Sequence, residues 1–330
     1  MMTIKEILFG YYGTQCVATV VELKIADLIE SGVTHIDDLA QKTSSRSGKL
    51  YRIMRFLTAK GVFTEHPGQK FSLNKESKQL LSSHPENIQD FIKLHASYFY
   101  QGAGKIYESM STDVTPFELE FGSIAGQYFR DNDVAGEIYN SAMKENSELY
   151  GRLITELYDF SSYKNIIDIG GGIGSLIVNI LLKYQSANGI NFDIPNLQQR
   201  SEEYIGLSEV SHRCKYVSGD FYESIPQGGD IYLMKAILHG KTQEEAATLL
   251  EKCRQTMVSA KAKLLVIERA IINNSAHYVE ACTNDINMLN VTAGKVRTLA
   301  EFESLYDICG LNLHQIIPIT DSVCLMELSA

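Results

Sequence analysis

The sequence predicts an α/β protein in which a doubly wound, mostly parallel sheet follows a mostly helical N-terminal domain. Three observations predict this fold class. Strand and helix patterns alternate from about residue 165 onward, glycines crowd the turn after the first of these strands, and a run of helices near the start ends in a hairpin. With 330 residues the chain exceeds the usual size of one domain, so we expect two domains.

The N-terminal part has the pattern of a winged helix, which is three helices followed by a hairpin. Apolar spacing predicts helices over residues 12–29, 35–42 and 45–60. Two short apolar runs, 62–64 and 71–73, flank a Pro-Gly turn and predict the hairpin.

The third of these helices carries a stripe of basic residues, a feature of DNA-recognition helices and also of solvated helix faces. The stripe consists of Arg46, Lys49, Arg52, Arg55 and Lys60. A net charge of −10 and a pI near 5.3 argue against a chain that as a whole binds nucleic acid or anionic membranes. We therefore expect residues 1–110 to form a dimerisation domain, with a transcription regulator as a rival from a different class.

Nothing in the sequence indicates secretion, a membrane span or a metal site. The first residues carry no long apolar segment, and no run of about 18 apolar residues occurs. The six cysteines lie far apart without a C-x-x-C pair, and the histidines show no H-x-x-x-H spacing. We expect a cytoplasmic protein with reduced thiols, without a metal and without membrane or nucleic-acid partners.

The rest of the chain is expected to form a helical linker, residues 111–160, and a catalytic domain, residues 161–330. Helical segments over about 86–108 and 125–158 bridge the domains, and the stretch 115–122 between them predicts a loop with aromatic residues. Two late apolar runs, 312–317 and 323–328, predict an antiparallel hairpin at one edge of the sheet. The catalytic domain is predicted to contain strands at 165–169, 189–192, 214–217, 230–234 and 263–268, and helices at 175–184, 196–204, 243–257 and 299–309.

The turn after the first of these strands indicates a nucleoside-binding site. Asp168 lies in an isoleucine-rich segment, and Gly170, Gly172 and Gly174 follow it in D-x-G-x-G-x-G spacing. Glycines allow the backbone to turn tightly and to approach a ligand, and the loop leads into a helix N-terminus. Asp193, roughly twenty residues further on at the end of the next strand, is placed to accept hydrogen bonds from ribose hydroxyls.

The same spacing permits an NAD-dependent dehydrogenase, but three details count against it. A dinucleotide fold more often has an apolar residue at the position of Asp168, together with the spacing G-x-G-x-x-G. The third strand ends in Gly219-Asp220-Phe221, where Asp220 is placed to meet an adenine edge. An acidic pocket also suits a ligand with a sulfonium and an amino group better than it suits a pyrophosphate.

On these motifs the chain resembles the S-adenosylmethionine-dependent methyltransferases of the caffeate/hydroxyindole O-methyltransferase family, and it is also similar to bacterial phenazine methyltransferases. The most specific motifs are Asp168-Ile-Gly-Gly-Gly-Ile-Gly174, Gly189-Ile-Asn-Phe-Asp193-Ile-Pro195, Gly219-Asp220-Phe221, Lys235-Ala-Ile-Leu-His239, Asp285-Ile-Asn-Met288-Leu and Gly294-Lys-Val-Arg297-Thr298. The resemblance covers nearly the whole chain. It implies a Rossmann-like class I methyltransferase fold, a winged-helix dimerisation domain, a homodimer and S-adenosyl-L-methionine as the cofactor. The cofactor contacts that it implies are Gly170, Gly172, Asp193, Asp220, Phe221 and Lys235.

The resemblance also implies a general base and an acceptor pocket. His239 occupies the family's base position just beyond the fourth strand, and Glu268 at the end of the fifth strand would orient its imidazole. The acceptor is expected to be a small aromatic metabolite with a hydroxyl group. The residues that would contact it are Met143, Phe117, Phe121, Asn287 and Met288.

Some positions depart from the family pattern. The family commonly has His-Asp-Trp where this chain has His239-Gly240-Lys241, and it has a glutamate where this chain has Val296. Glu268 is therefore the expected acidic partner of the base, with Asp285 as a second candidate. Two alternatives to O-methylation stay open: N-methylation, and a non-methylating reaction with the same cofactor, such as decarboxylation or cyclisation.

Overall fold

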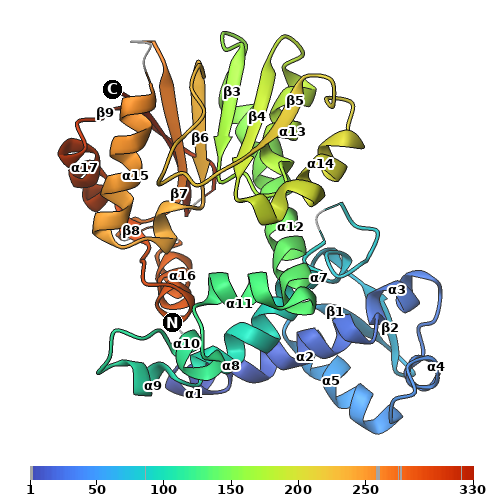
Figure 1. Ribbon diagram of the computed structural model, residues 1–330. Helices are drawn as coiled ribbons and strands as arrows, with labels where there is room; N and C mark the ends of the chain where they lie inside the picture. Colours follow the sequence, from blue (N-terminus) through green and yellow to red (C-terminus); the bar gives the residue numbers. More distant parts are fainter. Residues whose placement is uncertain (1–2, 86, 258–260, 274, 276, 321) are drawn as a thin grey trace. The chain divides into compact units, whose positions relative to one another are not determined.

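The computed structural model describes residues 3–85, 87–257, 261–273, 275, 277–320 and 322–330, without the side chains of residues 145, 146 and 149 (Figure 1). Contacts divide the chain into two compact units. The first comprises Met1–Gln101 with Val134–Glu145, and the second comprises Gly102–Asp133 with Asn146–Ala330. The domain limits expected from the sequence, at residues 110 and 160, stay a prediction. Among the described residues, no helix is long and apolar enough to cross a membrane.

The first unit is mostly helical and carries a two-stranded hairpin, as the sequence predicts. Apolar side chains that include Ile25, Met54 and Phe63 form its core. Strands β1 and β2 pair antiparallel around a turn in which Gly68 and Gln69 have positive φ. Its elements are α1 (Ile4–Leu8), α2 (Gly10–Glu22), α3 (Ile25–Glu30), α4 (Ile36–Lys42), α5 (Ser47–Ala59), β1 (Phe63–His66), β2 (Lys70–Leu73), α6 (Lys75–Lys78), α7 (Gln89–Leu94), the π-helical η1 (His95–Phe99) and the start of α8 (Tyr100–Ala103).

Three helical stretches expected from the sequence are divided in the structure. The stretch 12–29 forms α2 and α3, because Lys24 between them adopts a left-handed conformation with φ of 51°. The stretch 125–158 forms α11 (Ala125–Asp131) and α12 (Asp133–Leu157), which are separated by the extended residue Asn132. The stretch 86–108 forms α7, η1, α8 and α9 (Ile106–Ser109), and residue 86 lies outside the described residues.

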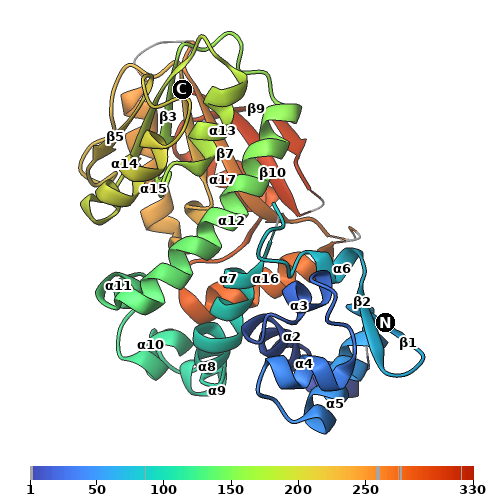
Figure 2. The same cartoon turned by 90° about the vertical axis from the view of Figure 1, so that its right-hand side faces the viewer.

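The second unit is built on a sheet with the strand order β5-β4-β3-β6-β7-β10-β9, to which β8 (Arg297–Thr298) is added beside β7. The five strands from β5 to β7 run parallel, whereas β10 pairs antiparallel with both β7 and β9 at the edge (Figure 2). The predicted parallel sheet and edge hairpin are therefore confirmed. The strands are β3 (Asn165–Ile169), β4 (Asn188–Asp193), β5 (Cys214–Ser218), β6 (Ile231–Lys235), β7 (Lys263–Ile271), β9 (Asn312–Pro318) and β10 (Val323–Ser329).

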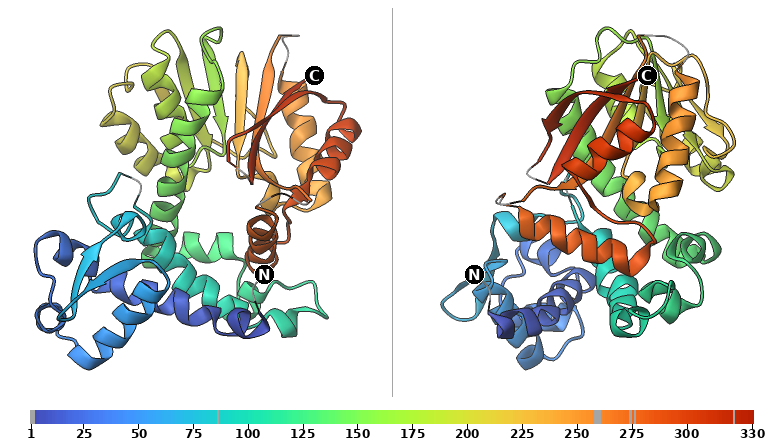
Figure 3. Two further views of the ribbon diagram at one scale, coloured as in Figure 1. Left: turned by 180° about the vertical axis from the view of Figure 1, so that it is seen from behind. Right: turned by 90° about the vertical axis from the view of Figure 1, so that its left-hand side faces the viewer.

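Two apolar cores hold helices on opposite faces of this sheet (Figure 3). On one face α15 (Gln243–Thr256) and α17 (Leu299–Ile308) pack on alternate residues of the central strands. On the other face α13 (Ser175–Lys183), α14 (Gln198–Gly206) and the end of α12 pack on the intervening residues. Apolar residues on both faces of each strand explain why these strands read as continuous apolar runs in the sequence. The carboxyl ends of the parallel strands meet at one edge, which carries the residues described next.

Two helices of the second unit were not expected. Residues 115–122, predicted to be a loop, contain α10 (Pro116–Phe121). The Thr115 hydroxyl accepts a hydrogen bond from the Glu118 amide at the start of this helix, and Gly122 ends it with φ of 76°. The motif Asp285-Ile-Asn-Met288-Leu, for which no helix was predicted, lies within α16 (Tyr278–Val291).

Candidate active site

The glycine turn after β3 combines close packing with open space. Gly170, Gly172 and Gly174 all have positive φ, of 67°, 61° and 96°. A Cβ on Gly170 would lie 2.5 Å from Ile237 Cδ1, whereas a Cβ on Gly172 would have no heavy atom of the described residues within 4 Å. The turn therefore requires glycine for its conformation, and at Gly172 it leaves its backbone accessible to a ligand.

Asp193, at the end of β4, is tied to this turn. Its Oδ2 accepts a hydrogen bond of 2.8 Å from the Gly172 amide, and its Oδ1 accepts one of 2.7 Å from the Ile194 amide. Burial raises the pKa of Asp193, and the two amides oppose that shift. The predicted pair of Gly172 and Asp193 is thus brought together in the structure.

Asp220 and Phe221 follow β5, the neighbour of β4. Asp220 is exposed, and its Oδ1 accepts a hydrogen bond of 2.8 Å from the Tyr222 amide, whereas Phe221 is half-buried. The Lys241 ammonium lies 5.5 Å from the Phe221 ring centroid and 5.2 Å from that of Tyr222, within the range of a cation–π contact. Lys241, one of the departures from the family pattern, is therefore close to the predicted adenine contacts.

Asp168 on β3 and the half-buried Lys235 at the end of the neighbouring β6 influence each other's charge. Asp168 is 1% exposed, and its Oδ2 has no hydrogen-bond partner among the residues that the structure describes. Burial raises the pKa of Asp168 to about 7, although the charge of Lys235 opposes the shift. Burial likewise lowers the pKa of Lys235, whose ammonium lies 5.9 Å from the Tyr150 ring centroid.

His239 follows β6 and is in direct contact with Glu268 on β7, a strand that continues to Ile271 instead of ending at residue 268 as the sequence predicts. His239 lies in the short helical turn η3 (Leu238–Gly240), and its Nδ1 is 2.7 Å from Glu268 Oε2. Glu268 is 1% exposed, while the His239 side chain keeps 24% of its surface. Burial alone would raise the pKa of Glu268, but the adjacent His239 and the hydrogen bonds from two backbone amides outweigh burial and lower it. Glu268 is therefore a carboxylate beside a partly exposed imidazole.

The other candidate acid, Asp285 on α16, has a different described contact. Its Oδ1 accepts a hydrogen bond of 2.8 Å from the amide of Val296, and the Val296 side chain is 2% exposed. Glu268 is thus the carboxylate that holds His239, and Asp285 holds the backbone of a neighbouring segment.

The predicted acceptor residues are distributed over both units. Phe117 and Phe121 lie on α10 in the second unit with ring centroids 4.5 Å apart, in a cluster with Tyr128 and Phe129. Phe117 is fully buried, so within this unit it supports the cluster and Phe121 carries its accessible surface. The half-buried Asn287 and Met288 lie on α16, which packs on α10, whereas Met143 lies on the part of α12 that belongs to the first unit.

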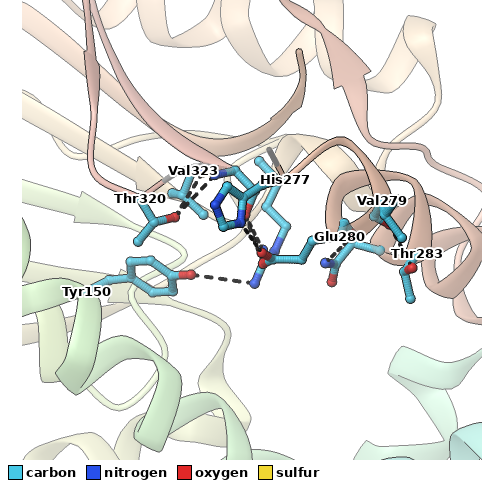
Figure 4. A network of polar contacts seen from close by, with 10 residues as sticks. Tyr150, His277, Val279, Glu280, Thr283, Thr320 and Val323 are labelled. Atoms are coloured by element: carbon cyan, nitrogen blue, oxygen red, sulfur yellow. Dashed lines mark hydrogen bonds and ion pairs between the residues drawn. The ribbon is translucent and has the colours of Figure 1, made fainter. Parts of the chain in front are cut away.

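A polar network that includes Tyr150, His277 and Glu280 was not predicted from the sequence (Figure 4). Arg269 Nη1 donates hydrogen bonds of 2.9 Å to Glu280 Oε1 and of 2.9 Å to Ser322 Oγ, and its Nη2 lies 3.5 Å from the Tyr150 hydroxyl. Figure 4 also shows His277 beside Glu280, with His277 Nδ1 3.3 Å from Glu280 Oε2. Strand alternation was the available signal, because Arg269 follows Glu268 and must point to the opposite face of β7.

Comparisons with known proteins identify the family. A family model described as an O-methyltransferase domain matches residues 101–312, and one described as an O-methyltransferase dimerisation domain matches residues 5–83. The phenazine O-methyltransferase PhzM of Lysobacter antibioticus is 29% identical over 98% of this chain and 94% of its own length. The phenazine-1-carboxylate N-methyltransferase of Pseudomonas aeruginosa is 27% identical over 94% of this chain and 92% of its own length.

Solved structures agree with this assignment. The crystal structure of LaPhzM has a TM-score of 0.89 at 28% identity, covering 99% of this chain and 98% of that one. The structure of the mitomycin 7-O-methyltransferase MmcR has a TM-score of 0.88 at 25% identity, covering 99% of this chain and 96% of that one. The predicted fold class, the cofactor S-adenosyl-L-methionine and the N-terminal dimerisation domain are confirmed. The chain belongs to the family of S-adenosylmethionine-dependent O-methyltransferases that carry an N-terminal dimerisation domain.

Proposed function

We propose that this protein, as a homodimer, methylates a hydroxyl group of a small aromatic specialised metabolite, with His239 as the general base. The observation that carries the proposal is the 2.7 Å contact between His239 Nδ1 and the buried carboxylate of Glu268. Because Nδ1 faces Glu268, the ring proton is held on Nδ1, and Nε2 is the nitrogen available to an acceptor. The names of the phenazine and mitomycin relatives support a polycyclic aromatic acceptor.

Each residue has a defined task in this mechanism. Bound S-adenosylmethionine supplies an already activated methyl group, so the protein chiefly orients the acceptor and accepts its proton. A phenol has a pKa near about 10 and is mostly protonated at neutral pH, so a base at the reacting oxygen assists attack. Glu268 keeps the imidazole in one orientation and stabilises its positive charge once His239 Nε2 has accepted the proton.

The residues at the strand ends fit a nucleoside with a zwitterionic tail. The open space beside Gly172 admits a ligand close to the turn, and Asp193 next to it has the acceptor oxygens that ribose hydroxyls need. Asp168 Oδ2 is a buried acceptor without a hydrogen-bond partner among the described residues, so it adds negative polarity beside the turn, which favours a cationic group nearby. We assign cofactor contacts to Gly170, Gly172, Asp193, Asp220, Phe221 and Lys235, with Lys235 near the carboxylate of the methionine moiety.

Acceptor binding is assigned to residues on α10, α12 and α16. Phe121 and Met288 offer half-buried apolar surface, and Asn287 offers a hydrogen-bonding amide. Phe117 supports Phe121 from within the aromatic cluster, and Met143, which belongs to the first unit, is the fifth residue for which the sequence predicts contact with the acceptor.

N-methylation is the second candidate, and two observations favour it. Two relatives, the phenazine-1-carboxylate enzyme and an 8-amino-8-demethylriboflavin dimethyltransferase of Streptomyces davaonensis, are named as N-methyltransferases. The apolar Val296 stands where the family has a glutamate, which leaves His239 with one carboxylate partner. A nitrogen acceptor with a free lone pair needs less help from a base than a hydroxyl does.

The test compares His239→Ala with wild type on paired acceptors, a hydroxyphenazine and a phenazine carboxylate, with S-adenosylhomocysteine as the measured product. For O-methylation we expect His239→Ala to lower kcat by about 10²–10⁴-fold while its affinity for S-adenosylmethionine stays within about twofold. An unchanged kcat on the preferred hydroxyl acceptor contradicts the base role. If only the nitrogen acceptor is methylated, and at the same rate by wild type and by His239→Ala, the result supports N-methylation instead. Formation of carbon dioxide or of a cyclised product without S-adenosylhomocysteine would revive the non-methylating alternative.

A further inference from the structure

The backbone that carries His239 is held from two sides by buried charges of opposite sign. On one side Glu268 Oε1 accepts hydrogen bonds from the amides of Leu238, at 2.6 Å, and His239, at 3.3 Å. On the other side the carbonyl of Leu238 accepts a hydrogen bond of 2.6 Å from Arg297 Nη1. Leu238 is thus bound through its amide to a carboxylate and through its carbonyl to a guanidinium.

The Nη2 and Nε groups of Arg297 donate hydrogen bonds to the residues that follow His239. Its Nη2 donates to the carbonyls of Lys241 at 3.1 Å and Thr242 at 3.2 Å, and its Nε donates to Gln243 Oε1 at 3.4 Å. The side chain is fully buried. Burial lowers the pKa of Arg297, and the negative charge of Glu268 opposes that shift. The planar guanidinium fork therefore fixes several carbonyls in one rigid geometry, which the three rotatable donors of a lysine ammonium on its flexible stem do not reproduce.

The segment that leads to Arg297 also packs directly on the backbone around His239. A Cβ on Gly294 would lie 2.1 Å from the His239 carbonyl oxygen and 2.5 Å from the Lys241 amide nitrogen. Only glycine allows this approach of two backbones. The segment is anchored in turn by the Asp285 carboxylate, which accepts the Val296 amide at 2.8 Å.

From this geometry we infer that Arg297 is a positioning residue for His239. It sets the orientation of the imidazole through the backbone of residues 238–242, without itself contacting the ring. The inference rests on the proposed function, because the position of the ring matters for catalysis only if His239 is the base. A displacement of about 1 Å at a reacting group lowers rates by up to about 100-fold, so a modest shift of this turn would be measurable.

The first variant is Arg297→Lys, which keeps the positive charge and removes the fork. We expect kcat to fall about 10- to 100-fold while the affinity for S-adenosylmethionine stays within about twofold. Nitrogen-15 NMR of histidine-labelled protein gives a second readout, because the Nδ1 proton of His239 reports its hydrogen bond to Glu268. This signal should move in Arg297→Lys. The matched control is Lys295→Ala, which removes an exposed lysine of the same segment that pairs with Glu301.

A folded Arg297→Lys protein with wild-type kcat and a wild-type His239 signal overturns the inference. If this variant does not fold, Gln243→Ala decides, because it removes only the acceptor of Arg297 Nε. There we expect a smaller loss of kcat, about threefold, together with a shifted ring signal. If neither kcat nor the His239 ring signal changes in Gln243→Ala, the inference is likewise overturned. Failure of the proposed function looks different, since His239→Ala would then keep its activity while the ring signal still responded to Arg297→Lys.

Discussion

On β7 the carboxylate of Glu268 contacts three groups: the His239 ring and the amides of Leu238 and His239. A buried carboxylate stays ionised only if hydrogen bonds and a nearby positive charge replace its lost hydration. Here the imidazole and two amides do so, and they lower the pKa of Glu268 in spite of its burial. The same contacts therefore maintain the charge and fix the direction of the ring.

Two adjacent glycines of the turn after β3 should respond differently to substitution. At Gly171 an alanine Cβ would lie 2.0 Å from Asn191 Oδ1 and 2.6 Å from Asp168 Oδ2, so buried polar groups must move. We expect Gly171→Ala to lower the free energy of unfolding by about 1–3 kcal/mol. Gly172→Ala meets no atom, and its φ of 61° costs only about 1 kcal/mol.

Affinity for the cofactor separates the roles of these glycines. In Gly172→Ala the added methyl group fills open space beside Asp193, so we expect S-adenosylmethionine to bind at least about tenfold more weakly to a nearly normally stable protein. Urea denaturation and isothermal titration calorimetry measure the two quantities. Wild-type affinity in Gly172→Ala would show that the cofactor does not approach the turn at this position.

The sequence was sufficient to predict those site residues whose positions follow from the ends of strands. Asp193 and Lys235 end the parallel strands β4 and β6, and Glu268 lies in β7 one residue beyond its last pairing with β6, so all three lie toward one edge of the sheet. It named Gly171 and Arg297 only as members of motifs and predicted no role for either residue. Their importance depends on distances between atoms, a Cβ overlap at Gly171 and a fork of hydrogen bonds at Arg297, and residue spacing does not encode such distances.

Among the elements, α16 connects several parts of the site. It carries Asn287 and Met288 of the proposed acceptor set and Asp285, which holds the Val296 amide. Its first turn is joined to the end of β7 through Glu280 and Arg269. The helix is therefore fixed at its start by the side chain of Arg269, one residue beyond Glu268. Near its middle it is fixed by the backbone amide of Val296, one residue before Arg297.

Glu280→Gln tests the attachment of the first turn of α16. Glu280 Oε1 accepts hydrogen bonds of 2.9 Å from Arg269 and 2.9 Å from Ser322, and its pKa is lowered because these bonds and His277 outweigh the effect of burial. Because Glu280 is about half exposed, we expect a loss of less than about 1 kcal/mol in global stability. Locally, hydrogen exchange of the first-turn amides should accelerate several-fold. Glu303→Gln on α17 is the control, and equal exchange in both variants would contradict the attachment.

Elements with regular patterns were predicted correctly, and those with inverted or short patterns were not. The strands from β3 to β7 are apolar on both faces and read as clear runs. In α16 the large apolar residues Val279 and Ile286 are 71% and 54% exposed, whereas Asn290 is 3% exposed. Large apolar residues thus lie on its exposed side and a polar residue on its buried side, which weakens the pattern that hydrophobic periodicity relies on. In α10 the cap Thr115 and the terminal Gly122 were visible, but six residues are too few for a periodic pattern.

At the scale of the whole molecule, each unit has a hydrophobic core of its own. The glycine turn, the acidic strand ends and the His239–Glu268 pair all belong to the second unit. The first unit contains a titratable group of a different kind. His95 begins the π-helical segment η1 and lies between two phenylalanines, with ring centroids 4.3 Å from Phe91 and 4.9 Å from Phe99.

His95 should make the first unit sensitive to acid. Burial lowers the pKa of His95 to about 4, from about 6.5 in an unfolded chain. The folded state therefore binds this proton less readily than the unfolded state, and the stabilisation present above pH 6.5 is lost as the pH falls toward 4. The shift corresponds to about 3 kcal/mol of unfolding free energy between these limits. His95→Phe, which cannot ionise, should lose less stability over this range in urea unfolding followed by circular dichroism.

A control variant and a local measurement test whether His95 itself causes the acid sensitivity. His212→Gln replaces an exposed histidine and should keep the acid sensitivity of the wild type. Because the cofactor residues lie in the other unit, His95→Phe should also keep wild-type affinity for S-adenosylmethionine at pH 7. Hydrogen exchange of residues 95–99 at pH 5 then locates the effect: these amides should be better protected in His95→Phe than in wild type. Equal protection, or an equal loss of stability on acidification, would mean that charging of His95 does not drive the acid response.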